Sequence, residues 1–156
     1  MTKLEWNNKE KSLLFFDENN QPIYSSIEIL DNYQFVKIFE YGEISNSINM
    51  FINGDNVISL YKLKKDFQSR IKCIYIDPPF NTGKTFYHYE DALDRGDWLS
   101  MMKIRLELMY ELLSDGGVIF VHIDDSEMPY LKILLDEIFN PELRKYNPQS
   151  NYSRSS

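Results

Sequence analysis

Two short apolar runs on either side of one long amphipathic segment constrain the fold of this chain more than any other feature. The runs are residues 72–76 (KCIYI) and 118–123 (VIFVHI), and such nearly continuous apolar character is typical of strands that are covered on both faces. Between them, apolar residues recur at helical spacing from Trp98 to about Ser114. Strand, helix and strand in this order predict a βαβ unit with parallel strands.

The flanking segments extend this unit to the order β-α-β-α-β-α. A first short strand is expected over residues 49–53, followed by a helix that Asn56 caps. Asp97 is expected to cap the long helix, and the DGG sequence at 115–117 is expected to end it. A last helix begins near Ser126. The predicted fold class is therefore α/β, with a partial doubly wound parallel sheet.

Three regions are expected within the 156 residues, which are enough for one compact domain with its own core. Residues 1–47 have mixed character and form an N-terminal arm, in which 12–16 (SLLFF) and 35–39 (FVKIF) are either short strands or part of a loosely packed segment. Residues 48–140 carry the alternating pattern. Residues 141–156 are polar and end in a Ser-rich sequence, which predicts a disordered tail.

Cysteine, histidine and apolar content exclude several classes of protein. Cys73 is the single cysteine and lies in an apolar run, so it is expected to be buried and no internal disulfide can form. His88 and His122 stand apart from other metal ligands, so no metal site is predicted. The N-terminal residues lack the apolar core of a signal peptide, and no run approaches membrane-spanning length. We therefore expect a cytoplasmic protein without a membrane partner.

Polar residues follow each of the three expected strands. They are 53–55 (NGD), 77–80 (DPPF), and His122 with the pair at 124–125 (DD). Doubly wound sheets bind their ligands at the carboxyl ends of the strands, so this coincidence along one edge predicts an active site. The alternative for any single cluster is an ordinary polar turn, and for the pair at 124–125 it is a cap on the last helix.

The loop after the second strand allows two interpretations. The GKT sequence at 83–85 could be half of a phosphate-binding P-loop, but Pro78 stands where the first glycine belongs. Proline has no N–H to offer a phosphate, and the aromatic stretch at 86–89 is not typical of a helix start. A P-loop-like nucleotide-binding module is therefore the remote alternative.

The DPPF sequence fits a planar substrate with an exocyclic amine better. Asp77 offers a carboxylate at a strand end, and the stiff backbone of Pro78 and Pro79 offers carbonyl oxygens. The two N–H groups of an amine would bind the carboxylate and one proline carbonyl, while Phe80 would stack on the ring. A base in DNA can reach such a site only after it is flipped out of the duplex.

Residues 77–83 (DPPFNTG) resemble the catalytic motif of DNA amino-methyltransferases. The resemblance is closest to the permuted (beta-class) group, which includes the modification subunits of type III restriction–modification systems. It extends in family order over about residues 51–139. The further matching segments are GDN at 54–56, WLSMM at 98–102, LLSDGGVIF at 112–120 and IDD at 123–125.

This resemblance implies a Rossmann-like domain that transfers a methyl group from S-adenosylmethionine to adenine N6, or alternatively to cytosine N4. Residues 48–140 would be the catalytic half of that domain. Double-stranded DNA with a flipped base would be the substrate, a restriction subunit would be a partner, and no metal would be needed. The implied catalytic residues are Asp77, Pro78, Pro79 and Phe80. The implied cofactor-binding residues are Asp55, Asp77 and Trp98, with a plain core position as the alternative for Trp98.

The glycine pattern departs from the family. The six glycines form no G-x-G sequence, although the family resembled uses such a turn to hold the methionine part of the cofactor. Residues 141–156 also do not resemble the family's continuation. We therefore expect a truncated chain that is inactive alone; the alternatives are one half of a split methyltransferase completed by a second chain, and a binding remnant. The formal net charge of −7 agrees with an incomplete enzyme. Binding the phosphates of DNA needs basic residues, and these would lie elsewhere in the enzyme.

Overall fold

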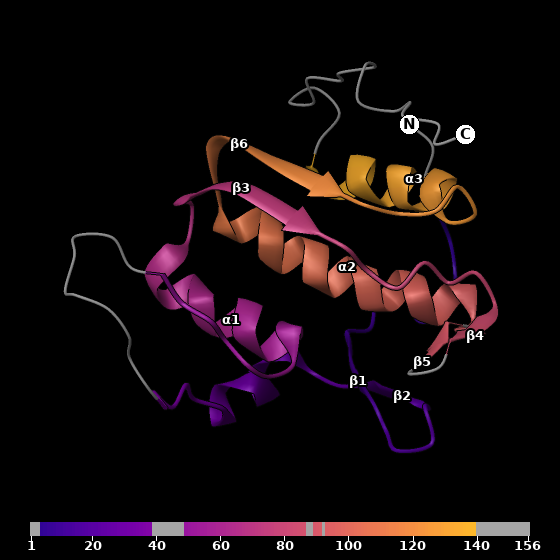
Figure 1. Cartoon of the computed structure of the whole chain (residues 1–156), viewed down its shortest axis with the longest axis horizontal. Coiled ribbons are helices and arrows are strands. Elements are labelled where there is room, and N and C mark those ends of the chain that lie inside the picture. The colour runs from indigo at the N-terminus through magenta and orange to yellow at the C-terminus, as the bar shows by residue number, and fades with distance from the viewer. Residues whose placement is uncertain (1–3, 39–48, 87–88, 92, 140–156) are drawn as a thin grey trace.

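The structure is a computed structural model that describes residues 4–38, 49–86, 89–91 and 93–139. It is a mixed α/β protein in which the long helix α2 runs beneath a small parallel sheet (Figure 1). In chain order the elements are β1 (Leu13–Phe16), β2 (Pro22–Tyr24), the 3-10 helix η1 (Ile27–Asn32), α1 (Asn56–Phe67), β3 (Ile71–Ile76), β4 (Lys84–Phe86), β5 (Tyr89–Asp91), α2 (Arg95–Leu112), β6 (Leu113–Val121) and α3 (Met128–Phe139).

The predicted βαβ unit is confirmed. β3 and β6 pair in parallel, with Ile74 beside Ile119 and Ile76 beside Val121. α2 carries the chain back to the start of β6, so both strands end on the same side of the molecule (Figure 1). Helices α1, α2 and α3 all begin near that side. The carboxyl ends of the strands and the amino ends of the helices therefore meet along one edge.

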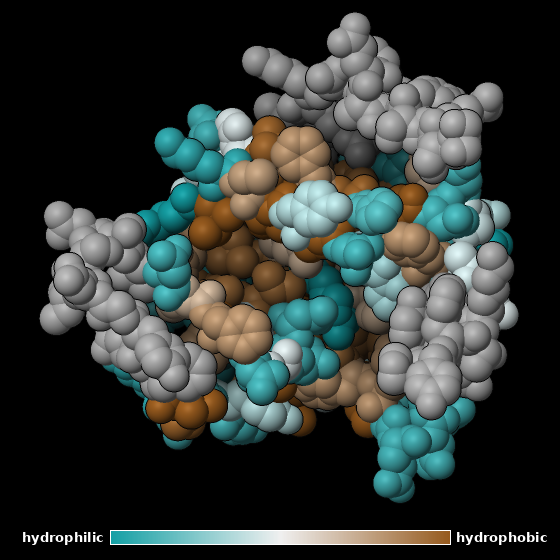
Figure 2. All heavy atoms as spheres, viewed as in Figure 1, coloured by the Kyte–Doolittle hydropathy of each residue, from teal (hydrophilic) through white to brown (hydrophobic). Residues whose placement is uncertain are grey.

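The expectation that both faces of the sheet are covered is wrong. Ile74, Ile76 and Ile119 pack against the main core, whereas Tyr75 is 68% exposed and Phe120 is 51% exposed. Side chains alternate between the two faces of a strand, and only one face of β3 and β6 lies against the core. Figure 2 shows hydrophobic side chains gathered over this part of the molecule.

Cys73 corrects a second expectation. It lies on the outward face of β3 and is exposed, although its apolar neighbours suggested burial. The reason is the same alternation, since Cys73 and Tyr75 point away from the core while Ile74 and Ile76 point toward it.

Helix α2 is buried on most of its sides, more than its sequence pattern indicated. Trp98, Met102 and Met109 belong to the main core together with residues of α3. Ile104 and Leu108 face a second cluster, which contains residues of β1, η1 and α1. The helix therefore separates two hydrophobic clusters and leaves little polar face. The buried residues of α2 are Trp98, Leu99, Ser100, Met101, Met102, Ile104, Arg105, Leu106, Leu108, Met109 and Leu112.

The first part of the chain belongs to the same core. Leu13 and Leu14 of β1 are both fully buried, one in each of the two clusters. The indole N–H of Trp6 donates to Oγ of Ser100 on α2 at 2.7 Å, and the backbone N–H of Leu4 donates to Oε1 of Glu137 on α3 at 2.7 Å. The predicted short strand at 12–16 is thus found as β1, whereas the described part of 35–39 forms no strand.

Arg105 joins three parts of the molecule from inside α2. Its Nε donates to Oδ1 of Asn56 at 2.7 Å, and its Nη2 donates to the Leu14 carbonyl at 3.2 Å and lies 3.7 Å from Oδ1 of Asp55. Burial lowers the pKa of Arg105, and the nearby Asp55 carboxylate opposes that shift. The guanidinium thereby holds β1 and the start of α1 against α2.

The expected strand over residues 49–53 is wrong. This segment has no strand assignment, and Phe51 is 86% exposed. A strand needs a neighbouring backbone to pair with, and the described residues place none beside it. The helix that follows begins as predicted, but its cap is Asp55 rather than Asn56, because Oδ1 of Asp55 accepts from the backbone N–H of Val57 at 2.8 Å.

The boundaries of α2 also differ from the prediction. Asp94 caps the helix by accepting from the backbone N–H of Gly96 at 2.8 Å. Asp97, the predicted cap, instead accepts a hydrogen bond of 2.7 Å from the Tyr24 hydroxyl. The helix ends at Leu112, ahead of the DGG sequence that was expected to end it.

The DGG sequence lies inside β6, where the pairing with β3 shifts register. Gly116 has a φ of +71°, which side chains disfavour. A Cβ on Gly117 would lie 2.9 Å from the Ser114 carbonyl oxygen and 3.0 Å from that of Ile71. Two glycines are therefore needed here for an abrupt passage from helix to strand, and not for a helix stop.

Candidate active site at the carboxyl ends of the parallel strands

Asp77 and His122 meet where the two parallel strands end. Each follows its strand directly, Asp77 after β3 and His122 after β6. The backbone N–H of His122 donates to the Ile76 carbonyl at 2.9 Å, so the pairing of the two chains continues one step past the strands. The imidazole Nδ1 of His122 lies 3.3 Å from Oδ1 of Asp77, with side chains 59% and 60% exposed. The carboxylate is therefore held by a neighbour and still open to a ligand.

An aromatic ring stands beside this pair. Phe80 contacts His122 edge to face, with ring centroids 5.3 Å apart and ring planes at 77°. Its side chain is half-buried. Edge-to-face packing sets the angle between two rings and leaves at least one face of each ring outside that contact. Asp77, Phe80 and His122 thus lie together as one cluster, named here the strand-end cluster.

Trp98 supports the turn that carries Phe80. Its indole Nε1–H donates to the Pro79 carbonyl at 2.8 Å, and the side chain is fully buried in the main core. The predicted site residue Trp98 therefore touches the DPPF turn from inside. A fully buried ring offers no surface to a ligand, so the predicted contribution of Trp98 to cofactor binding stays a prediction.

Asp55 lies at the start of α1 and not in the strand-end cluster. One of its oxygens caps the helix, and the same oxygen lies 3.7 Å from Nη2 of Arg105. The carboxylate is 39% exposed. The helix that Asp55 caps, α1, begins near the end to which β3 and β6 point (Figure 1). The cofactor role of Asp55 stays a prediction.

Sequence reasoning undervalued His122 and missed Glu127. The sequence places His122 only among the polar residues that follow a strand, because one histidine at a strand end carries no signal for its partner. Glu127 is 1% exposed and accepts hydrogen bonds from Asn81 and Arg95. Its position just before a helix predicts only a helix-dipole partner, and no pattern in the sequence indicates that this carboxylate is buried.

The structure does not support the P-loop alternative. The chain forms strand β4 from Lys84 to Phe86, antiparallel to β5, where a P-loop would begin a helix. The polar loop that was expected after β3 thus contains a short hairpin. Gly83, with a φ of +72°, provides the turn into β4.

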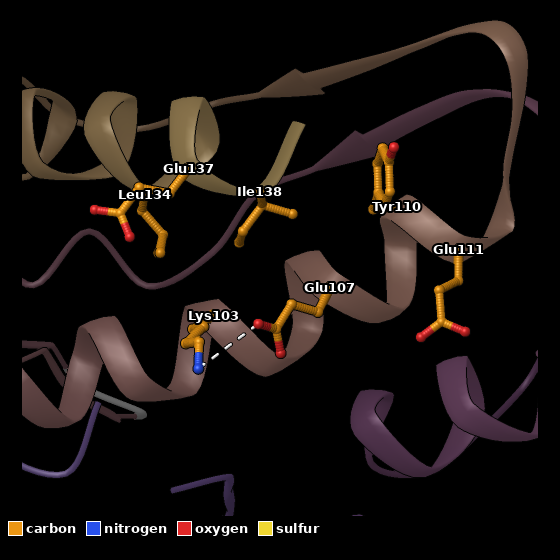
Figure 3. A pocket seen from close by; sticks show the side chains of 7 residues that line it. All are labelled: Lys103, Glu107, Tyr110, Glu111, Leu134, Glu137 and Ile138. Atoms are coloured by element: carbon orange, nitrogen blue, oxygen red, sulfur yellow. Dashed lines mark ion pairs between the residues drawn. The ribbon is translucent and has the colours of Figure 1, made fainter. Parts of the chain in front are cut away.

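A cavity among the described residues lies away from the strand-end cluster. It has a volume of about 430 Å³ and lies between the carboxyl-terminal halves of α2 and α3 (Figure 3). Its lining is Lys103, Glu107, Tyr110, Glu111, Leu134, Glu137 and Ile138. Burial, together with the nearby carboxylates of Glu10 and Glu111, raises the pKa of Glu107. Three carboxylates in an open groove carry no further sign of a ligand.

The described part of the chain contains no group of three or more acidic, histidine or cysteine side chains that could hold a metal ion. Among the same residues, no helix is long and apolar enough to cross a membrane.

The fold and the site define an α/β protein with a carboxylate and an aromatic ring exposed where parallel strands end. Comparison with known families then identifies the class further. The profile of the DNA methylase family matches residues 71–149, which is half of the chain, and the chain belongs to this family.

Individual relatives agree with the family. Over 92 residues the chain is 51% identical to the probable type III restriction-modification enzyme HindVI Mod subunit of Haemophilus influenzae, covering 59% of this chain and 12% of the relative. It is 36% identical over 125 residues to the StyLTI Mod subunit of Salmonella typhimurium, covering 62% and 19%. It is 42% identical over 100 residues to the type II methyltransferase M.EcaI of Enterobacter cloacae, covering 60% and 22%. The chain thus spans about a fifth or less of these relatives.

Proposed function

We propose that this chain forms the target-base site of a DNA amino-methyltransferase, with adenine N6 as the methyl acceptor. The strand-end cluster is the observation that carries the proposal. An exposed Asp77 carboxylate, oriented by His122 and flanked by Phe80, suits a planar ring with an exocyclic amine. Membership in the DNA methylase family supports the same reaction class.

The chemistry follows from the acceptors in the DPPF turn. One amine N–H would donate to Asp77 and the other to the carbonyl of Pro78. The neighbouring carbonyl of Pro79 already accepts the indole N–H of Trp98 at 2.8 Å, so that bond favours Pro78 as the acceptor. Two fixed acceptors would hold the nitrogen so that its lone pair points at the methyl donor, and this positioning would supply much of the rate.

Phe80 would stack on the base after the base has left the duplex. Stacking on an aromatic side chain is worth about 1–3 kcal/mol per base, which offsets part of the cost of flipping. His122 would keep the Asp77 carboxylate in place while the base enters. The complete proposed catalytic set is Asp77, Pro78, Pro79 and Phe80.

S-adenosylmethionine supplies a sulfonium methyl group when bound. The proposed residues toward it are Asp55 and Asp77, with Trp98 acting through Pro79. The fit rests on Asp55, whose carboxylate remains 39% exposed at the start of α1 and can accept hydrogen bonds from hydroxyl or amino groups. The fold proposed for the whole enzyme is a doubly wound parallel sheet, of which β3 and β6 are two strands.

Double-stranded DNA with a flipped base is the proposed substrate. A restriction subunit is one proposed partner, because the chain is similar to Mod subunits of type III restriction-modification enzymes. A second chain with the glycine-rich cofactor turn is the other proposed partner, because the sequence contains no G-x-G. For that reason we propose that residues 1–156 do not methylate DNA by themselves. Transfer of labelled methyl from S-adenosylmethionine to DNA by the purified chain tests this point, and robust incorporation would contradict it.

The base site itself is testable in the chain of 18.6 kDa by nuclear magnetic resonance. Adenosine should shift the resonances of Phe80, Asp77 and His122 in a saturable way. Inosine, which carries an oxygen in place of the amine, is the matched control and should shift them far less. Asp77→Ala should remove the adenosine response. Equal responses to adenosine and inosine would sink the proposal, and a stronger response to cytidine would assign the acceptor to cytosine N4.

A further inference from the structure

Glu127 is a carboxylate that the reaction does not use and that is 1% exposed. It lies directly before α3, 50 positions beyond Asp77 in the sequence. Burying a carboxylate is costly unless it is paired and hydrogen-bonded. A glutamate that only filled space at this position would therefore destabilise the fold relative to an apolar residue.

Two partners satisfy this carboxylate. Nε of Arg95, at the start of α2, donates to Oε1 at 3.2 Å and to Oε2 at 3.1 Å. Nδ2 of Asn81 donates to Oε1 at 3.0 Å. Glu127 therefore joins the beginning of two helices to the turn that follows β3.

Both neighbours are themselves held. The guanidinium of Arg95 lies 4.2 Å from the ring centroid of Tyr130, and its Nη1 donates to the Tyr130 hydroxyl at 3.3 Å. Oδ1 of Asn81 accepts from the backbone N–H of Leu93 at 2.8 Å. With both ends of its amide engaged, Asn81 cannot rotate without breaking a hydrogen bond.

Asn81 also has an unusual backbone. Its φ is +55°, in the left-handed region that costs free energy for any residue with a side chain. It is the residue directly after Phe80. The direction in which the chain leaves Phe80, and hence the placement of that ring, depends on Asn81 keeping this conformation.

We propose that Glu127 is a positioning residue that aims Phe80 at the target base by clamping Asn81. The identity of the ligand in this proposal rests on the proposed function. The claim that Glu127 positions Phe80 through Asn81 does not. Glu127 touches no reacting atom; it acts through Asn81 on the turn, as residues behind an active site commonly do. Arg95 balances the negative charge of Glu127, and its hydrogen bonds hold the Glu127 carboxylate at the start of α2.

The experiment compares Glu127→Ala with Glu127→Gln in the full chain. Glutamine keeps an oxygen for the Asn81 amide, whereas alanine removes it. In Glu127→Ala the side-chain amide resonances of Asn81 and the ring resonances of Phe80 should shift, and affinity for adenosine should fall by about 10- to 100-fold. In Glu127→Gln the resonances of Asn81 and Phe80 and the affinity for adenosine should stay close to those of the unmodified chain. Lys132→Ala, which removes an exposed pair with Asp136 on the same helix, is the control and should change neither.

A variant at the other end of the clamp keeps the test independent of the folding of Glu127→Ala. Asn81→Gly allows a positive φ but has no amide, and should lose adenosine affinity as Glu127→Ala does. Combining it with Glu127→Gln should add no further loss. A folded Glu127→Ala with unchanged Phe80 resonances, or an Asn81→Gly that binds adenosine normally, would overturn the proposal. If the unmodified chain ignores adenosine, the proposed function fails, while the shifts at Asn81 and Phe80 still decide the clamp.

Discussion

The indole N–H of Trp98 donates a hydrogen bond of 2.8 Å to the carbonyl of Pro79. This contact links the most deeply buried aromatic residue of α2 to the turn that carries the candidate catalytic residues. Because proline has no N–H, the turn has few bonds of its own, and support from α2 takes their place. The core and the site are therefore mechanically connected at this point.

Trp98→Phe tests that connection. The substitution keeps an aromatic ring in the core but leaves the Pro79 carbonyl without its donor, so we expect a loss of about 1–2 kcal/mol in unfolding free energy. The resonances of Phe80 should also shift. Trp6→Phe is the matched control, because it loses an indole bond of 2.7 Å to Ser100 away from the turn. Equal shifts of Phe80 in the two variants would argue against the connection.

Arg105→Met should destabilise the whole domain. Asn56, Asp55 and the Leu14 carbonyl would lose a buried donor, and breaking a buried charged contact costs about 3–5 kcal/mol. Urea unfolding measures the difference. Arg70→Met is the control, since Arg70 makes an exposed bond to the Asp66 carbonyl, and it should cost less than about 1 kcal/mol. Similar costs for both variants would show that Arg105 is not structural.

Leu13→Ala tests whether the N-terminal arm is part of the core. Leu13 is fully buried beside residues of α2 and α3, so we expect a loss of about 2–5 kcal/mol in a single cooperative transition. Ile23→Ala, in the paired strand β2 and at a side chain 42% exposed, should change stability by only about 0.5 kcal/mol. Retention of full stability in Leu13→Ala would mean that the arm is detachable.

Glu107→Gln should change the pH dependence of stability. Burial raises the pKa of Glu107, so the folded state binds this proton more tightly than the unfolded state does. The contribution of Glu107 is therefore favourable below its ordinary pKa and is lost as the pH rises through the raised value. We expect a higher Tm than the unmodified protein at pH 7 and no advantage at pH 4. An advantage that grows toward acid would contradict this assignment.

Phe120→Lys tests the uncovered face of the sheet. Tyr75, Val118 and Phe120 leave an apolar surface exposed over β3 and β6 (Figure 2), and unpaired sheet edges add to the risk of association. We expect the unmodified chain to self-associate in sedimentation velocity and Phe120→Lys to do so less. Ile29→Lys, at an exposed site outside the sheet, is the control. A monomer whose melting is independent of concentration would contradict the prediction.

Local sequence determined the elements with strong periodicity. The apolar runs predicted β3 and β6, helical spacing predicted α2, and the buried positions Leu131, Leu134 and Leu135 of α3 also recur at helical spacing. The motif at 77–83 and its family were also readable, because the chemistry of Asp, two prolines and an aromatic ring is local. These features depend on residues within a few positions of one another.

Tertiary structure decided everything that depends on a distant partner. Residues 49–53 contain a short apolar run, but they have no neighbouring strand among the described residues. Cys73 is exposed because one face of its sheet is uncovered. A role for His122 follows only from its contact with the Asp77 carboxylate. A role for Glu127 follows only from the hydrogen bond that it accepts from Asn81. Hydrogen bonds between segments far apart in the sequence form only when packing brings the segments together. No local sequence pattern could therefore predict them.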